Sequence, residues 1–320
     1  MPDLEWEEMM KRYYTYNGFQ LFDYRIFHDD LVIGSFSFSF YKESSNFYEG
    51  NEKVVKFGIE LLRNYRKRGL EKKALKLMLD DCVNHHKTIF LTERQDAYMK
   101  HFFETIGAQI VQTEIKNRLD LDKVDYQMVQ GWIKEGKMIN PDTRVITTED
   151  NIPAELESEY AKAFNDAIQQ IPHDDIDMKR KEFTVVDLRE MEKIDDASHV
   201  KSINVFTLEK TGEVSGITII KVLPGSDVSV YQGITGVPLA YRGRKLGKWI
   251  KAKMVLYLKE KYPLCKSIIT GNSKTNEPML YINNHLGFKR YNEVNSFQIT
   301  LDELKLSLVP EILELNEMIL

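Results

Sequence analysis

The sequence predicts an α+β fold in which one unit of strands and helices occurs twice along the chain. In each half, two apolar strands are followed by a third strand, which leads into a cationic, glycine-containing turn that opens a helix. A further strand and a helix that ends at a glycine complete the pattern. Gly107 follows Arg66 by 41 positions, and Gly287 follows Arg242 by 45 positions. This repeated spacing indicates a duplication.

The elements of the first half are placed from apolar patterning and turn residues. They are strands at 21–27, 31–41 and 54–61, a helix from the turn at 65–71 to about 83, a strand at 88–91, a helix at 98–106, a strand end at 120–122 and a helix at 124–134. The aromatic residues of this half are expected in the core, namely Tyr13, Tyr14, Tyr16, Phe36, Phe38 and Phe40.

The second half repeats the pattern after two additional helices. Its predicted elements are a strand at 144–147, helices at 154–168 and 179–193, a hairpin of 203–208 with 214–222, a strand at 228–237, a helix at 245–262, a strand at 267–270, a helix at 276–286 and the last strands within 291–300. We expect the apolar tail at 301–320 to pack on a domain; self-association is the alternative. The boundary is predicted in the segment 134–141, which gives domains of residues 1–136 and 137–320.

The composition excludes several classes of function. The chain has 320 residues, of which 42% are hydrophobic and 29% charged, and its net charge of −5 provides no overall field for nucleic acid. Cys82 and Cys265 lack metal-ligand spacing and predict a reducing compartment. No secretory signal and no apolar run near the roughly 20 residues of a membrane span is found. We therefore predict a cytoplasmic protein without metal, nucleic-acid or membrane partners, as a monomer or homodimer.

The segment Thr235–Lys248 is the most informative part of the chain. The first amides of a helix have no intrahelical acceptor and lie at the positive end of the helix dipole, so they can bind an anion together. The charges of Arg242, Arg244, Lys245 and Lys248 surround the start of such a helix. We predict a phosphate or pyrophosphate site here; the alternative is a solvated helix start.

This turn and the helix downstream of it resemble the GNAT superfamily of N-acetyltransferases. The family turn Arg/Gln-x-x-Gly-x-Gly/Ala corresponds to residues 242–247, which read Arg-Gly-Arg-Lys-Leu-Gly. The family's downstream pattern is matched by Asn276, Met279, Gly287 and Phe288. The chain is similar to the tandem-domain bacterial acetyltransferases that include mycothiol synthase, over roughly residues 20 to 300. The resemblance implies two tandem GNAT-like domains, each a mixed, mostly antiparallel sheet flanked by helices.

The resemblance also implies the ligand and its contacts. Acetyl-CoA would lie along the end of the apolar strand, with its pyrophosphate in the turn. The implied cofactor-binding residues are Thr235, Gly236, Val237, Arg242, Gly243, Arg244, Lys245, Leu246, Gly247, Lys248, Asn272 and Asn276. The backbone N–H near Val237 would stabilise the oxyanion, and Tyr231 and Gln232 are candidate bases by position. Asn276 is equally interpreted as a helix N-cap.

Three positions depart from the family pattern. Lys245 replaces the first motif glycine, which is tolerable if this residue keeps a helical φ. Its ammonium suits a phosphate, so we expect cofactor binding to survive. Asn283 stands where many members have a tyrosine that protonates the leaving thiolate, and an amide is no acid. Tyr281 is predicted on the far side of that helix, in the core.

The corresponding turn of the first half is degenerate. Glu71 occupies the position of the last glycine, and Asp96 occupies that of Asn276. Two carboxylates facing the cofactor phosphates would repel them. We therefore predict that the first copy does not bind acetyl-CoA and serves as a scaffold.

These observations lead to one functional hypothesis and two alternatives. The hypothesis is an acetyl-CoA-dependent N-acetyltransferase whose second domain acetylates a primary amine of a small molecule by direct attack. The alternatives are a protein or peptide N-acetyltransferase and a non-catalytic CoA-binding or interaction protein. In the segment 171–177, His173, Asp174 and Asp175 are interpreted either as amine-binding or basic groups or as a solvated loop. His85 and His86 are expected at an exposed helix end.

Overall fold

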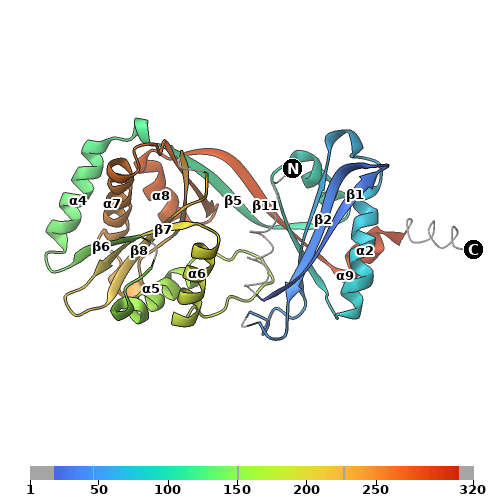
Figure 1. Ribbon diagram of the computed structural model, residues 1–320, viewed down its shortest axis with the longest axis horizontal. Helices are drawn as coiled ribbons and strands as arrows, with labels where there is room; N and C mark the ends of the chain where they lie inside the picture. Colours follow the sequence, from blue (N-terminus) through green and yellow to red (C-terminus); the bar gives the residue numbers. More distant parts are fainter. Residues whose placement is uncertain (1–17, 46, 150, 226–227, 310–320) are drawn as a thin grey trace, which may run out of the picture. The chain divides into compact units, whose positions relative to one another are not determined.

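The computed structural model describes residues 18–45, 47–149, 151–225 and 228–309 (Figure 1). These residues form two compact units. Unit 1 comprises the described residues up to 113, together with 173–181 and those from 294 onward, and unit 2 comprises 114–172 and 182–293. Both units contain sheets with helices packed on them, so the predicted α+β class is confirmed.

The strands of unit 1 are β1 (Phe19–His28), β2 (Leu31–Tyr41), β3 (Val54–Leu61), β4 (Ile89–Arg94) and the second half of β11 (Lys289–Thr300). They lie in the order β1-β2-β3-β4-β11, and only the β3–β4 pair is parallel. The helical segments are η1 (Arg63–Tyr65), α2 (Leu70–Asn84), α3 (Ala97–Thr105) and α9 (Leu301–Ser307).

The core of unit 1 lies on the face of the sheet that α2 covers. Phe36, Phe38 and Phe40 alternate along β2 and are 1%, 1% and 4% exposed. They share one apolar cluster with Leu75 and Met78 of α2. The prediction that these phenylalanines form core is therefore confirmed. The predictions for Tyr13, Tyr14 and Tyr16 and for the end of the apolar tail concern residues outside those that the structure describes.

The strands of unit 2 are β5 (Gln109–Asp120), whose first residues belong to unit 1, and β6 (Arg144–Glu149), β7 (Lys201–Leu208), β8 (Val214–Val222), β9 (Ser229–Gly236) and β10 (Ser267–Ser273). They lie in the order β5-β10-β9-β8-β7-β6, and only the β9–β10 pair is parallel. The helical segments are η2 (Leu121–Lys123), α4 (Tyr126–Ile139), η3 (Ala154–Leu156), α5 (Glu157–Gln169), α6 (Val185–Ala197), η4 (Leu239–Tyr241), α7 (Leu246–Lys261) and α8 (Glu277–Leu286).

Helix α7 is central to unit 2. Its residues Ile250 and Met254 are 0% exposed, and α7 packs side by side with α4 (Figure 1). Gly136 of α4 permits this approach, because a side chain there would overlap the ring of Trp249. Helix α4 ends at Ile139, so the predicted boundary between 136 and 137 lies within it. This boundary was placed between the two copies of the repeat, and it stays a prediction.

Helix α6 begins later than predicted. We expected a helix from Lys179, but α6 starts at Val185, because Thr184 and Asp187 form a capping box there. The residues before it have another role, since Ile176 and Met178 pack in unit 1 against Leu91.

The final strand also differs from the prediction. The segment 291–300 was expected to supply several strands, but β11 is continuous over Lys289–Thr300. Its residues Asn295–Thr300 pair with β4, which lies about two hundred positions earlier in the chain. Apolar patterning does not specify such a distant partner. In the described part of the chain, no helix has both the length and the apolar character to cross a membrane.

Candidate active site

A hollow of about 570 Å³ in unit 2 lies where β9 ends and α7 begins. Residues of α5, the β9–α7 turn and α8 line it. They are Ala167, Gln170, Ile171, Pro172, Thr235, Gly236, Val237, Tyr241, Arg242, Gly243, Lys245, Leu246, Gly247, Lys248, Thr275, Asn276, Pro278, Met279, Tyr281 and Ile282. Ten of the twelve predicted cofactor residues therefore meet at one place, and Arg244 and Asn272 do not line it.

The turn that enters α7 contains two residues in the left-handed region. Gly243 has a φ of 81° and Lys245 has a φ of 60° and a ψ of 17°. The condition of a helical φ at Lys245 is therefore not met. The chain must reverse here before the first helical turn, and Gly69, at the same position of the unit 1 turn, has a φ of 76°. A non-glycine residue in this region costs roughly 1–2 kcal/mol.

The backbone amides at the start of α7 are available to a ligand. The first intrahelical bond recorded is from the Trp249 N–H to the Lys245 carbonyl, at 3.1 Å. Among the described residues, no acceptor is recorded for the amides of Leu246, Gly247 and Lys248. Three adjacent N–H groups at a helix N-terminus are able to donate to one anion together.

The cations beside these amides are held in different ways. Arg242 donates to the Val237 carbonyl at 3.4 Å and to the side chain of Gln170. Lys245 forms an ion pair with Glu135. The Lys248 ammonium lies 5.1 Å from the centroids of two aromatic rings, those of Trp132 and Tyr281. All three side chains are on the lining of the hollow or at its rim.

Arg244 is directed away from the hollow. Its guanidinium donates to Asn140 at 2.8 Å, to Thr143 at 2.9 Å and to Glu209 at 3.0 Å. Burial acts to raise the pKa of Glu209, but its hydrogen bonds with Ser215, Arg244 and Thr143 lower it overall. Arg244 therefore fixes the turn to the rest of unit 2.

The strand beside the hollow is unpaired on one edge. β9 pairs with β10 only over Ser229–Gln232, whereas its pairing with β8 continues to Gly236. The two parallel strands therefore separate after Gln232, and the segment 233–237 keeps one free edge toward the hollow. Val237, which is predicted to provide the oxyanion N–H, lines the hollow at the end of this edge.

The other predicted catalytic residues do not line the hollow. Asn283 is 1% exposed, donates to Asn272 at 2.7 Å, and has a side-chain oxygen without a partner. Gln232 is 6% exposed, and Tyr231 is 43% exposed. Tyr281 was expected in the core, but it is 53% exposed and lines the hollow, so that expectation is wrong. Tyr281 and Asn283 lie on different faces of α8, and the face that carries Tyr281 is directed toward the hollow.

A buried hydrogen-bond chain ends at the hollow. Lys251 donates to Gln232 at 2.6 Å, and Gln232 donates to Thr218 at 2.9 Å. The hydroxyls of Thr218 and Thr235 are 2.7 Å apart. Burial lowers the pKa of Lys251 to about 7. When Thr218 donates to Thr235, the Thr235 hydroxyl hydrogen is free to point at a ligand.

Sequence reasoning missed Lys251, although a signal was present. Lys251 follows Gly247 by four positions and precedes Met254 by three, so it lies on the buried face of α7. A lysine at that spacing has to find a polar partner in the core.

Asn276 acts as the N-cap of α8, with its side chain accepting from the Met279 N–H at 3.4 Å. The cap interpretation is confirmed, and Asn276 also lines the hollow. His173, Asp174 and Asp175 are not among the lining residues, and they belong to the segment that packs in unit 1. In the described part of the chain, no group of three or more His, Cys, Asp or Glu side chains could hold a metal ion.

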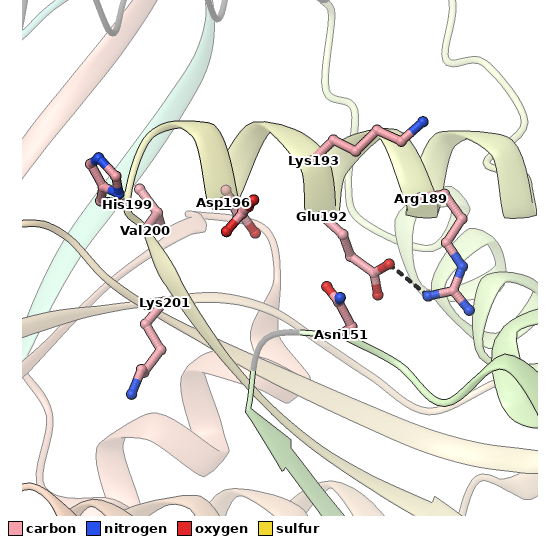
Figure 2. A pocket seen from close by; sticks show the side chains of 9 residues that line it. Asn151, Arg189, Glu192, Lys193, Asp196, His199, Val200 and Lys201 are labelled. Atoms are coloured by element: carbon pink, nitrogen blue, oxygen red, sulfur yellow. Dashed lines mark hydrogen bonds and ion pairs between the residues drawn. The ribbon is translucent and has the colours of Figure 1, made fainter.

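A second hollow of unit 2, of about 610 Å³, lies where α6 ends and β7 begins (Figure 2). Figure 2 shows Arg189 and Glu192 directed toward each other, at 2.6 Å. Asp195 is bonded to Lys221 and to Ser202. Arg189, Glu192 and Asp195 are thus paired, and none of the predicted cofactor residues lines this hollow, so we place the candidate site at the first hollow.

Comparison with solved structures identifies the architecture. A tandem GNAT protein from the clavulanic acid biosynthesis pathway, without acetyl-CoA, superimposes with a TM-score of 0.71 at 18% identity, covering 89% of this chain and 84% of that one. The chain has the tandem GNAT fold. A GCN5-related N-acetyltransferase from Sphaerobacter thermophilus has a TM-score of 0.55 at 11% identity and covers 85% of this chain and 78% of its own. Neither protein-family models nor curated proteins give a match.

A third structure with a GNAT-like arrangement is a conserved protein of Enterococcus faecalis described as a probable N-acyltransferase. It has a TM-score of 0.52 at 11% identity and covers 94% of this chain and 66% of its own. In the GNAT fold of unit 2, the hollow lies at the splayed strands and the helix start that the sequence singled out.

Proposed function

We propose that this protein is an acetyl-CoA-dependent N-acetyltransferase that acts on a primary amine of a small molecule, with its active site in unit 2. One observation carries the proposal. The free edge of β9, three unpaired amides of α7 and a cationic rim meet in one hollow of about 570 Å³.

The hollow has the donor set that acetyl-CoA requires. The amides of Leu246–Lys248 fit a pyrophosphate, and Arg242 and Lys248 add charge beside them. Gly247 places no side chain beside these amides; a Cβ there would meet the Ile282 side chain at 3.4 Å, an ordinary contact distance. The free edge at 233–237 fits the amides of a pantetheine arm as an added strand.

The chemistry of the bound cofactor is that of an acetyl thioester. The Val237 N–H and the Thr235 hydroxyl would face its carbonyl and stabilise negative charge as an amine attacks. The described lining contains no carboxylate or imidazole. We therefore expect the amine to react as the free base taken from solvent, so that activity rises with pH toward the pKa of the amine.

The lack of a lining base also favours one alternative, a CoA-binding module without turnover. Thiol release from acetyl-CoA across small primary amines, diamines and peptides separates these functions. Turnover of small amines supports the proposal, whereas turnover of peptides alone indicates a protein or peptide acetyltransferase. Saturable acetyl-CoA binding without thiol release from any amine would leave only the binding module. The cytoplasmic location and the monomeric or dimeric state stay predictions.

The site assignment has its own test. Gly247→Glu places a carboxylate among the free amides, and Gly247→Gln is the matched neutral control. We expect the Glu variant to lose acetyl-CoA binding and thiol release together, and the Gln variant to lose less, because charge repulsion adds to the loss of space. Unchanged kinetics in both variants would contradict the assignment.

A further inference from the structure

A separate hollow of about 690 Å³ lies within unit 1, on the sheet face opposite α2. The cationic turn of unit 1 does not line it. Its polar lining comes from β2, β3, β4 and β11 and consists of Ser37, Ser39, Lys56, Thr92, Glu93, Arg94 and Ser296. Its apolar lining includes Phe19, Leu21, Tyr41, Phe47, Leu91, Ile176 and Met178.

Lys56 has no ion-pair partner within 4 Å among the described residues. Its ammonium lies over the Phe19 ring, 5.6 Å from the centroid. Burial lowers the pKa of Lys56, and the charge of Glu93 partly opposes this effect. A half-buried ammonium against an aromatic ring is poorly compensated.

Arg94 brings a second cation to the same hollow. It donates to the Glu93 carbonyl at 2.7 Å and to the Ile59 carbonyl at 3.3 Å, while its Nε is buried without a partner. The Glu60 carboxylate is 4.0 Å away and mostly exposed. Among the described residues, the Arg94 Nε is therefore a buried donor without an acceptor beside this hollow.

Gly58 keeps the space in front of the guanidinium open. A Cβ at this position would lie 3.4 Å from Arg94 Nη2 and 3.7 Å from the Ser37 hydroxyl. On another side, the rings of Phe19, Tyr41 and Phe47 stack in series, with centroids 4.1 Å and 5.6 Å apart. The hollow therefore joins a polar, cationic part to an aromatic wall.

We propose that this hollow binds a small monocarboxylate with an apolar or aromatic body. The carboxylate would pair with Lys56 and Arg94 and accept from the hydroxyls beside them. The two cations and Glu93 give the lining a formal charge of +1. A net charge of +1 is neutralised by one carboxylate, whereas a phosphate dianion would leave an excess negative charge. The aromatic wall contacts the apolar body of the ligand.

Acetyl-CoA is a poor match for this site. The strands β3 and β4 pair only over Val54–Lys56 with Ile89–Leu91, and beyond that point Arg94 crosses from β4 to the Ile59 carbonyl. The guanidinium therefore occupies the gap that the corresponding strands of unit 2 leave free.

Calorimetry with the full chain tests the proposal. The probes are 3-phenylpropionate, its neutral amide and inorganic phosphate. We expect saturable binding of the carboxylate at least tenfold tighter than binding of the amide or phosphate. Lys56→Met should weaken the carboxylate at least tenfold while leaving the amide unchanged. Gly58→Val should weaken both, because it fills the space before Arg94.

Two further measurements keep this result separate from the proposed enzyme activity. Gly247→Glu in unit 2 should leave carboxylate binding unchanged, and Lys56→Met should leave acetyl-CoA binding unchanged. Circular dichroism shows whether each variant is folded. Equal affinity for carboxylate and amide, no saturable carboxylate binding, or unchanged binding in a folded Lys56→Met variant would each overturn the proposal.

Discussion

The two cationic turns of this chain have nearly the same backbone but different surroundings. Residues 66–71 correspond to residues 242–247, and each turn has left-handed residues at its second and fourth positions. In unit 1 these are Lys67 and Gly69, and in unit 2 they are Gly243 and Lys245. Lysine and glycine have exchanged places, so the backbone is preserved although the strained residue differs.

The two turns differ in the side chains that interact with them. In unit 1 the Lys67 N–H donates to the Tyr98 hydroxyl at 2.8 Å, and that hydroxyl donates to Glu71, which is 2% exposed. Asp96 is 3.4 Å from Arg66. In the unit 1 turn, Glu71 and Asp96 therefore interact with Tyr98 and Arg66. The corresponding positions of unit 2 are the glycine at 247 and the neutral cap Asn276, which both line the hollow.

The largest effect is expected from Arg244, which is the counterpart of Arg68. Arg244→Ala removes three hydrogen bonds and leaves Glu209 partly buried without its cation. We expect a loss of about 3 kcal/mol in the free energy of unfolding, measured with urea. Arg68→Ala is the matched control, since Arg68 lies over the Tyr65 ring at 4.9 Å. Its loss should stay below about 1 kcal/mol; equal losses would contradict the different roles assigned to the two arginines.

Lys251 provides a pH-dependent prediction. Its pKa in the folded state is about 7, below the ordinary value near 10.4, so the folded protein binds fewer protons between these limits. Stability of the wild type should rise with pH in this window. Lys251→Met should be more stable at pH 6 and 7 by on the order of 2 kcal/mol, with the advantage shrinking toward pH 9. An advantage that is the same in urea titrations at every pH would show that Lys251 is not a buried cation.

Asn276→Asp converts the unit 2 cap into the residue that unit 1 has at Asp96. Both side chains cap their helices, so stability should change little. The added charge beside the hollow should weaken acetyl-CoA binding about tenfold, equivalent to about 1.4 kcal/mol. Calorimetry and thermal unfolding measure the two effects separately. A stable variant with unchanged affinity would leave Asn276 as a cap only.

The smallest effect concerns the strained lysine of unit 1. Lys67 has a φ of 63°, and Lys67→Gly should stabilise the protein by about 0.5–1 kcal/mol. The glycine retains the N–H that bonds to Tyr98. Urea titration measures the change, and a destabilised variant would mean that the lysine side chain contributes more than its backbone strain costs.

Local signals in the sequence predicted the strands, helices and turns well. The β-strand at 31–41 and the strand at 54–61 have the predicted bounds, and Gly287 is the left-handed cap that its position required. The meeting of most predicted cofactor residues in one hollow followed from the turn and its spacing to α8. These features depend on residues that are close together in the chain, so their pattern in the sequence is enough to predict them.

Features that depend on distant partners could not be predicted in this way. The pairing of β11 with β4, the commitment of Arg244 to Glu209 and the packing of 173–181 in unit 1 all join segments far apart in the chain. The sequence does not show that position 245 requires a positive φ, because a lysine seldom adopts one; the comparison with Gly69 reveals it.

The central claim is that unit 2 alone provides an acetyl-CoA site. Calorimetric titration of acetyl-CoA into the wild type, Gly247→Glu and Glu71→Gly tests it most directly. The account predicts one site per chain in the wild type and in Glu71→Gly, where Arg94 still fills the gap between β3 and β4, and none in Gly247→Glu. Two sites in the wild type, or undiminished binding in a folded Gly247→Glu variant, would contradict it.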